Sequence, residues 1–194
     1  MSIRTILARV LLTFASACSP SMVHEREIPE PVQASRSPWP VAAGMLGLAT
    51  FSAKVLVLSR QDYPVTRADT LSAVSPVDLA VAWGPAADVQ SRKAVQIRQT
   101  GRRYEWRART SDMHLPGVHD FTRHSGNWHL IPASAEVAHD LARIDRGDVV
   151  AIEGDLVQVT FIDGTYYRSS MVRDVVGDGA CEIVRVRSVA FVER

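Results

Sequence analysis

The sequence predicts a mainly β fold of the α+β class, and three observations support this prediction. Several short segments alternate apolar and polar residues, which is the period of a strand with one buried face. One well-capped helix is expected at 134–148, between the third and fourth strands. The longest segment changes phase at Gly154, as a bulged strand does. We therefore expect a small OB-like closed barrel with one main helix, and the alternative is an open antiparallel sheet with helices on one face.

Residues 1–18 are predicted to be a signal peptide of the lipoprotein type. Arg4 gives a basic start, the apolar run 10–17 ends in small residues, and Cys18 follows as the residue to be acylated. The run is shorter than the ~20 apolar residues of a transmembrane helix. We expect an exported domain, periplasmic or anchored to the membrane by a lipid at Cys18. Removing residues 1–17 moves the formal net charge from +1 to about −1, so global charge predicts no polyanionic partner.

Residues 19–50 are predicted to form a flexible linker, and residues 51–194 a single globular β-rich domain. Five of the ten prolines lie in the first 40 residues, where they interrupt any helical pattern. The segment 39–58 is apolar apart from Lys54, so it suits either a second membrane segment or a strand. We favour a strand, because polar Ser52 and Lys54 alternate with apolar neighbours.

Two elements are predicted before the histidine-rich region. Residues 75–88 suit a short helix that Ser75 caps, and residues 93–110 suit a hairpin that turns at Thr100–Gly101. Tyr104 and Trp106 occupy one face of this hairpin. The other face is basic and carries the candidate binding residues Arg98, Arg103, Arg107 and Arg109. Such a face binds anions in some barrels, although an ordinary solvated strand face has the same pattern.

The remaining elements are one helix and two strands. Ser134 caps the helix, its apolar stripe contains Val137, Leu141 and Ile144, and Gly147 ends it. The long strand with the phase change at Gly154 follows, then a turn at Asp163–Gly164 and a closing strand near the end of the chain.

Five histidines lie within 26 residues, and four of them, His114, His119, His124 and His129, are spaced five apart. That spacing places neighbours on different faces of a helix or a strand, so only a folded loop could gather them around a metal ion. We predict no metal and no cofactor. His129 lies in an apolar run, which favours a buried imidazole that braces the loop. Together with Asn127, His124 and His129 complete the candidate binding residues.

Cys181 is the candidate nucleophile. It follows a glycine-rich turn, and a catalytic thiol needs a base within reach, which His124 or His129 could supply. The alternative is a small residue packed at the start of a strand.

Four patches carry a resemblance: "SPVDLAVAWGP", "QTGRRYEW", "HSGNWHLIPA" and "RSSMVRDVVGDGACE". Together they resemble a family of small uncharacterised bacterial proteins with an N-terminal signal or anchor. The resemblance covers about residues 51–189, and "HLIPA" and "GACE" are its most specific parts. Gly126, Asn127 and Trp128 stand where that family more often has Ala-Asn-Met. The resemblance implies one exported domain and no particular chemistry.

The function predicted from these features is binding rather than catalysis. We expect a membrane-tethered domain that binds or scaffolds an anionic envelope component, or a protein partner, through the basic hairpin and the loop 114–129. Export argues against a nucleic-acid partner. The alternative is a metal-dependent or Cys/His-dependent enzyme that uses the loop 114–129 and Cys181.

Overall fold

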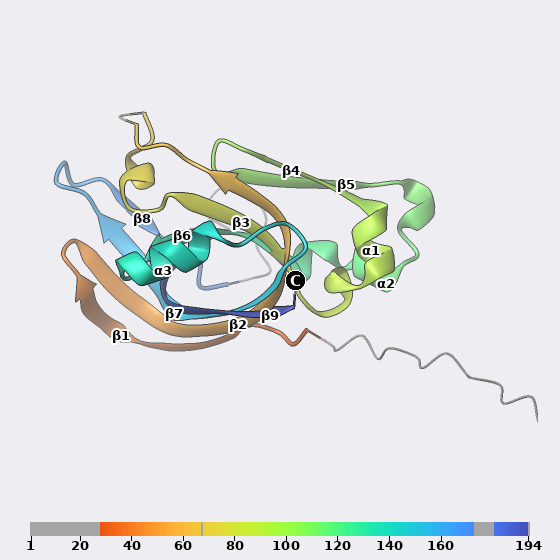
Figure 1. Cartoon of the computed structure of the whole chain (residues 1–194), viewed down its shortest axis with the longest axis horizontal. Coiled ribbons are helices and arrows are strands. Elements are labelled where there is room, and N and C mark those ends of the chain that lie inside the picture. Colours follow the sequence, from red (N-terminus) through yellow and green to blue (C-terminus); the bar gives the residue numbers. More distant parts are fainter. Residues whose placement is uncertain (1–27, 67, 173–180, 194) are drawn as a thin grey trace, which may run out of the picture.

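Strands account for most of the regular structure in the described part of the chain. The computed structural model describes residues 28–66, 68–172 and 181–193. Figure 1 shows β1 and β2 on one side of the molecule and the β4–β5 hairpin, with α1 and α2, on the other. The prediction of a mainly β fold is confirmed. In chain order the elements are β1 (Val32–Ala42), β2 (Met45–Asp62), η1 (Thr70–Ala73), β3 (Val77–Ala82), η2 (Gly84–Ala87), α1 (Val89–Ala94), β4 (Val95–Thr100), β5 (Arg103–Ala108), η3 (Thr110–Asp112), α2 (Pro116–His119), η4 (Phe121–Arg123), β6 (Ser125–Pro132), α3 (Ala135–Ala142), β7 (Val149–Thr160), β8 (Tyr166–Arg168) and β9 (Glu182–Glu193).

The large sheet contains a ring of strands. Its order is β1-β2-β3-β6-β9-β7-β8, and β2 also pairs with β7, so β2, β3, β6, β9 and β7 pair in a closed cycle. β6 and β9 run parallel, and the other pairs of this sheet are antiparallel. β4 and β5 form a separate two-stranded sheet. β2 reaches β1, β3 and β7 because it is 18 residues long.

The main hydrophobic core lies against the face of β3 and β6 that carries Leu79 and Trp128. These two residues are directly paired across the strands, and both are buried. Trp128 stacks on Trp83 with ring centroids 6.2 Å apart and meets Phe51 edge to face at 5.1 Å. Leu141 of α3 packs into the same core. Each large side chain buried in this way stabilises the fold by roughly 1.5–3 kcal/mol.

Several predicted features are present. The β4–β5 hairpin lies within the expected range, and the Ser134 hydroxyl accepts a hydrogen bond from the Val137 amide at the start of α3. The pairing of β7 with β9 shifts register at Gly154, as the phase change predicted. A Cβ on Gly154 would lie 2.4 Å from the Arg185 carbonyl oxygen, so glycine is needed for the close approach of these strands. The turn after β7 contains Gly164 at φ +83°.

The predicted helix at 75–88 is wrong. Residues Val77–Ala82 form strand β3, and only the short 3-10 turn Gly84–Ala87 follows. All six residues of β3 are buried. A strand that is covered on both faces shows no polar alternation, so its apolar run was compatible with a helix as well.

The predicted linker at 19–50 is also wrong over its second half. Residues Val32–Ala42 form β1, which pairs antiparallel with β2. β1 is an edge strand with register shifts around Pro38 and Pro40, and such positions tolerate the missing amide proton of proline. The predicted loop 114–129 likewise ends in strand β6.

The second membrane segment considered for residues 39–58 is instead the end of β1 and most of β2. No helix within the described ranges is long and apolar enough to cross a membrane. The predicted signal peptide and the lipidation site Cys18 lie outside the described residues.

Candidate functional site

Three adjacent strands bring the polar residues of the candidate site onto one face. Asp78 of β3 lies directly opposite His129 of β6, and Asn127 precedes His129 by two residues. His129 also lies beside Ile183 of β9, and Cys181 precedes Ile183 by two residues. Side chains that are paired across strands or two residues apart share a face of the sheet. The register therefore places all four polar side chains on the same side.

The β4–β5 hairpin covers this face. Gln99 of β4 donates a hydrogen bond from Nε2 to Oδ1 of Asn127 at 2.7 Å. The Tyr104 hydroxyl lies 2.5 Å from the Ser125 hydroxyl at the start of β6, and burial raises the pKa of Tyr104. These contacts fix the inner face of the hairpin to the large sheet.

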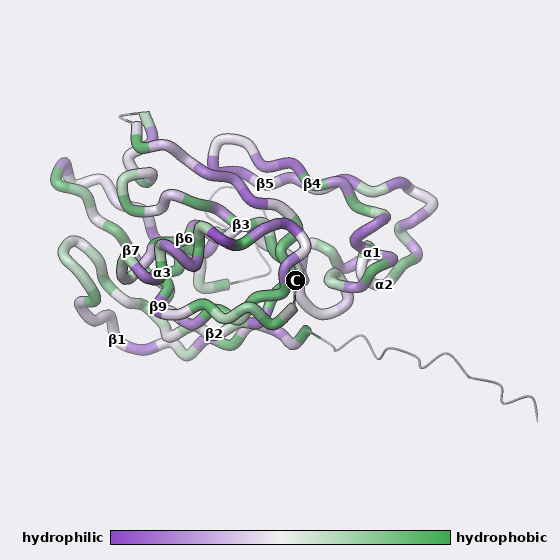
Figure 2. The backbone as a smooth tube through the Cα atoms, viewed as in Figure 1, coloured by the Kyte–Doolittle hydropathy of each residue, from purple (hydrophilic) through white to green (hydrophobic). Residues whose placement is uncertain are grey.

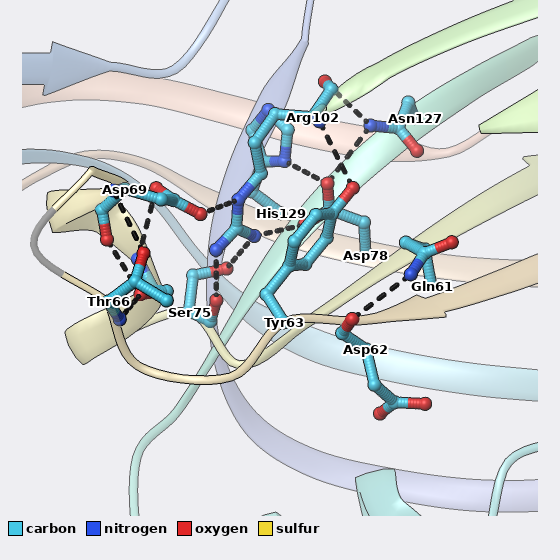
Figure 3. Close-up of polar contacts among 11 residues, drawn as sticks. Gln61, Asp62, Tyr63, Thr66, Asp69, Ser75, Asp78, Arg102, Asn127 and His129 are labelled. Atoms are coloured by element: carbon cyan, nitrogen blue, oxygen red, sulfur yellow. Dashed lines mark hydrogen bonds and ion pairs between the residues drawn. The ribbon is translucent and has the colours of Figure 1, made fainter. Parts of the chain in front are cut away.

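Arg102 turns inward from the tip of the hairpin, as Figure 3 shows. Gly101 and Arg102 have φ values of +56° and +68°, as in the tight turns that join hairpins. A side chain in this region of backbone space is strained by roughly 1–2 kcal/mol. The guanidinium contacts offset that strain: Nε donates to Asp69 Oδ2 at 2.8 Å, Nη1 to Asp78 Oδ1 at 2.6 Å, and Nη2 to the Ser75 carbonyl oxygen at 2.7 Å.

Tyr63 packs against the same guanidinium. The centroid of its ring lies 3.7 Å from Cζ of Arg102, and its hydroxyl accepts a hydrogen bond from the Arg102 amide at 3.1 Å. Burial and the charge of Asp78 raise the pKa of Tyr63 to about 12, so the phenol is neutral at physiological pH. A cation over an aromatic ring contributes roughly 0.5–2 kcal/mol.

Asp78 is completely buried and has a donor at each oxygen. Arg102 contacts Oδ1 of Asp78. At Oδ2, Nδ1 of His129 lies 2.9 Å away and Nδ2 of Asn127 lies 3.3 Å away. The His129 contact is too bent for a regular hydrogen bond, so it acts as an ion pair. We call Asp69, Asp78, Arg102, Asn127 and His129 the Asp78 cluster. Its two carboxylates balance two cations when His129 is protonated, as a buried charge requires.

His129 is protonated at neutral pH in this setting. Burial alone would lower the pKa of its imidazole, but the interactions with Asp78 and Cys181 outweigh burial and raise the pKa to about 9. Cys181 is a free and partly exposed thiol. Cys181, His129 and Asp78 therefore form a series of thiol, imidazole and carboxylate that runs from the partly exposed side of the cluster to its buried centre.

The outer face of the hairpin is exposed and basic. Arg98 lies opposite Glu105 across the two strands, and the exposed side chains of this face also include Arg103, Arg107 and, just after β5, Arg109. Tyr104 and Trp106 point the other way and pack against the core. This is the orientation expected from the alternation. Much of the hairpin is coloured as hydrophilic in Figure 2, whereas β2 is largely hydrophobic.

The histidines do not gather. His114 and His119 are exposed, and His124 lies 3.2 Å from Glu30 and is hydrogen-bonded to the Asp120 carbonyl oxygen. Of the four evenly spaced histidines, His129 alone joins the Asp78 cluster. Within the described ranges no group of three His, Cys, Asp or Glu side chains is arranged to hold a metal ion. The predicted binding residues thus divide: Asn127 and His129 lie in the cluster, whereas His124 and the four arginines lie outside it.

Sequence reasoning missed Asp78, Asp69 and Tyr63, and it did not single out Arg102. Asp78 could have been noticed as a carboxylate inside the apolar run of β3. Charged residues are seldom buried without a partner, so this position indicates a buried ion pair. Arg102 lies in a two-residue turn, where side chains do not alternate as they do along a strand. The sequence pattern therefore did not predict that Arg102 points inward. Asp69 and Tyr63 come from the β2–β3 connection, which shows no pattern.

The four patches quoted above all contribute to this region. Asp78 comes from the first, Gln99 and Arg102 from the second, His129 from the third and Cys181 from the fourth. No family model, curated protein or solved structure that was compared with the chain matches it. The resemblance based on the four patches stays a prediction.

Proposed function

We propose that this chain is an exported, membrane-tethered binding domain that holds an anionic component of the cell envelope on the outer face of the β4–β5 hairpin. The observation that supports the proposal is the exposed set of Arg98, Arg103, Arg107 and Arg109 on a hairpin whose inner face is fixed. The tip is held through Arg102 and the Asp78 cluster. A surface fixed in this way loses little conformational freedom when an anion binds.

We further propose that the ring of five strands is an OB-like closed barrel. Three features support this: the closed cycle of pairings, the parallel pair β6–β9, and α3 between the third and fourth strands of the ring. OB-like barrels bind ligands on the face of their second and third strands and on adjoining loops. Here those strands are β3 and β6, and the hairpin lies between them in sequence and over their outer face. This support is an analogy at the level of the fold.

The proposal is tested with anionic vesicles and with isolated peptidoglycan. Arg98, Arg103 and Arg107 are replaced together by Glu in the full chain, and sedimentation with phosphatidylglycerol vesicles, phosphatidylcholine vesicles and peptidoglycan is measured. One cation near an anionic membrane contributes about 1 kcal/mol, so loss of three weakens binding by about 100-fold or more. We expect binding to at least one anionic probe, weakened by added salt, and loss of that binding in the variant.

The matched control replaces three exposed arginines elsewhere, Arg123, Arg146 and Arg168, by Glu. The two variants have the same net charge, so a difference in binding between them must come from the position of the replaced arginines. Equal losses in both variants would show that global charge drives the binding. Binding by the hairpin variant at the wild-type level, or no binding of the wild-type chain to either anionic probe, would overturn the proposal.

The alternative function, thiol chemistry, is favoured by one observation. Interaction with Cys181 is one cause of the raised pKa of His129, whereas His124, the other base considered, pairs with Glu30. This contact is independent of the basic surface.

A further inference from the structure

We propose that Cys181 is a reactive thiol that forms a mixed disulfide with low-molecular-weight disulfides, and that His129 is the base that holds its proton. The proposal concerns the partly exposed end of the Asp78 cluster. It does not depend on anion binding at the hairpin, so each proposal can fail without the other.

The placement of the three groups follows from the strand register. β3, β6 and β9 are neighbours, and Asp78, His129 and Cys181 fall on the same face of these three strands. The imidazole of His129 is 92% buried and is held by Asp78 on one side. Cys181 interacts with this imidazole and is partly exposed, so it is the outermost member of the series. A reagent therefore meets the sulfur before it meets the base.

The charged group beside the thiol of Cys181 is the imidazole of His129. A cationic imidazole next to a cysteine stabilises the thiolate, which is the nucleophile in thiol chemistry. His129 carries a proton at neutral pH, and its raised pKa of about 9 agrees with that state. Asp78 holds the imidazole in place, as the carboxylate of a catalytic triad does.

The other charged groups near His129 do not cancel this effect. Arg102 reaches Asp78 from the hairpin and shares its negative charge, and Tyr63 is neutral at physiological pH. Glu182 follows Cys181 but pairs in register with Trp128, so it lies on the opposite face of β9. Among the described residues, the groups that face the imidazole on its own side are thus Asp78, Arg102 and the thiol.

The reaction is a thiol–disulfide exchange. The sulfur of Cys181 attacks the sulfur that carries R in R–S–S–R′. The S–S bond of the small disulfide breaks, and a new S–S bond joins Cys181 to the sulfur that carries R. The leaving R′–S⁻ takes up the proton that His129 received from Cys181. The net change is Cys181–SH plus R–S–S–R′ giving Cys181–S–S–R plus R′–SH, so the small disulfide is the oxidant.

The test measures how fast Cys181 reacts with 5,5′-dithiobis(2-nitrobenzoate), which is itself a disulfide. The full chain carries Cys18→Ser, so that Cys181 is the single thiol. Rates are measured between about pH 6 and pH 8 in this parent, in His129→Gln and in His124→Gln. His124 is a matched control because it is a half-buried, hydrogen-bonded histidine whose polar partners are Glu30 and the Asp120 carbonyl oxygen. Mass spectrometry of the intact chain counts the adducts.

We expect the parent and His124→Gln to react at similar rates that change little with pH. An ordinary thiol is only ~0.3% ionised at pH 6, and the lower nucleophilicity of a stabilised thiolate offsets part of the gain. At pH 6, Cys181 should therefore react about tenfold more slowly in His129→Gln than in the parent. The rate in this variant should rise about tenfold for each unit increase in pH. Equal rates in the parent and His129→Gln at every pH would overturn the proposal.

A second measurement needs no substitution at His129. The parent chain is compared at pH 6 in its folded state and unfolded in urea. We expect the folded chain to react faster, although its thiol is only partly exposed. Slower reaction of the folded chain, or no adduct without denaturant, would show that Cys181 is a packing residue.

Discussion

Replacing Asp78 by Asn tests whether the Asp78 cluster is an ionised network that stabilises the fold. The substitution keeps the size and shape of the side chain and removes its charge. Asp78 is fully buried, accepts hydrogen bonds from Arg102 and Asn127, and forms an ion pair with His129. An amide offers one acceptor oxygen, and its NH₂ group must face at least one of these donors.

The expected loss in free energy of unfolding is about 3 kcal/mol at pH 7. Breaking a buried charge pair by removing one partner costs roughly 3–5 kcal/mol. The lower end applies for two reasons. Arg102 keeps Asp69 at 2.8 Å and the Ser75 carbonyl oxygen at 2.7 Å. His129 can also lose its proton once the carboxylate is gone.

The assay is urea unfolding followed by tryptophan fluorescence, because Trp83 and Trp128 are buried in the main core and become exposed on unfolding. With a urea slope of about 2 kcal/mol/M, 3 kcal/mol shifts the midpoint by about 1.5 M. The control is Asp140→Asn, since Asp140 is only partly buried and its pair with Arg143 is long at 3.5 Å, so the change in stability should be less than about 0.5 kcal/mol. A loss below about 1 kcal/mol in Asp78→Asn would refute the ionised network.

Two further predictions concern pH and packing. The pKa of His129 is raised from 6.5 to about 9, so its contribution to stability is complete below pH 6.5 and is lost as pH rises through about 9. This contribution to the free energy of unfolding is about 3 kcal/mol. The urea midpoint of the wild type should therefore fall between about pH 6 and pH 10, and that of His129→Gln should fall much less. An equal fall in the two proteins would contradict the prediction. Gly154→Ala should destabilise by about 2–4 kcal/mol, because its Cβ would lie 2.4 Å from the Arg185 carbonyl oxygen and the backbone must move. Gly126→Ala, whose nearest atom would be a side-chain nitrogen at 3.3 Å, should cost less, and equal thermal midpoints for the two variants would count against this packing argument.

Elements with one buried face were predictable from the sequence, and elements buried on both faces were not. The β4–β5 hairpin alternates exposed arginines with packed aromatic residues, and α3 has a single apolar stripe. β3 is buried at all six positions, and β6 is buried at six of eight, so neither shows a period of two. β1 contains prolines that are typical of a linker but acceptable at the edge of a sheet.

The site was predictable only in part. The apolar context of His129 indicated a buried imidazole, and the alternation indicated the basic outer face. The partners of His129 could not be inferred, because Asp78 lies about 50 residues earlier and Cys181 about 50 residues later in the chain. Strand register brings them together, and register depends on the whole sheet. Arg102 adds a second reason, since the direction of a turn residue is set by backbone conformation rather than by alternation.

The closed cycle of strand pairings has a consequence for how the chain folds. Met45 at the start of β2 pairs with Val159 near the end of β7, and β9 fills the space between β6 and β7. Contacts between residues so far apart require long loops to close before any pairing energy is gained, which makes folding slow. The Cys181 site depends on the pairing of β9 with β6, so it should form late in folding.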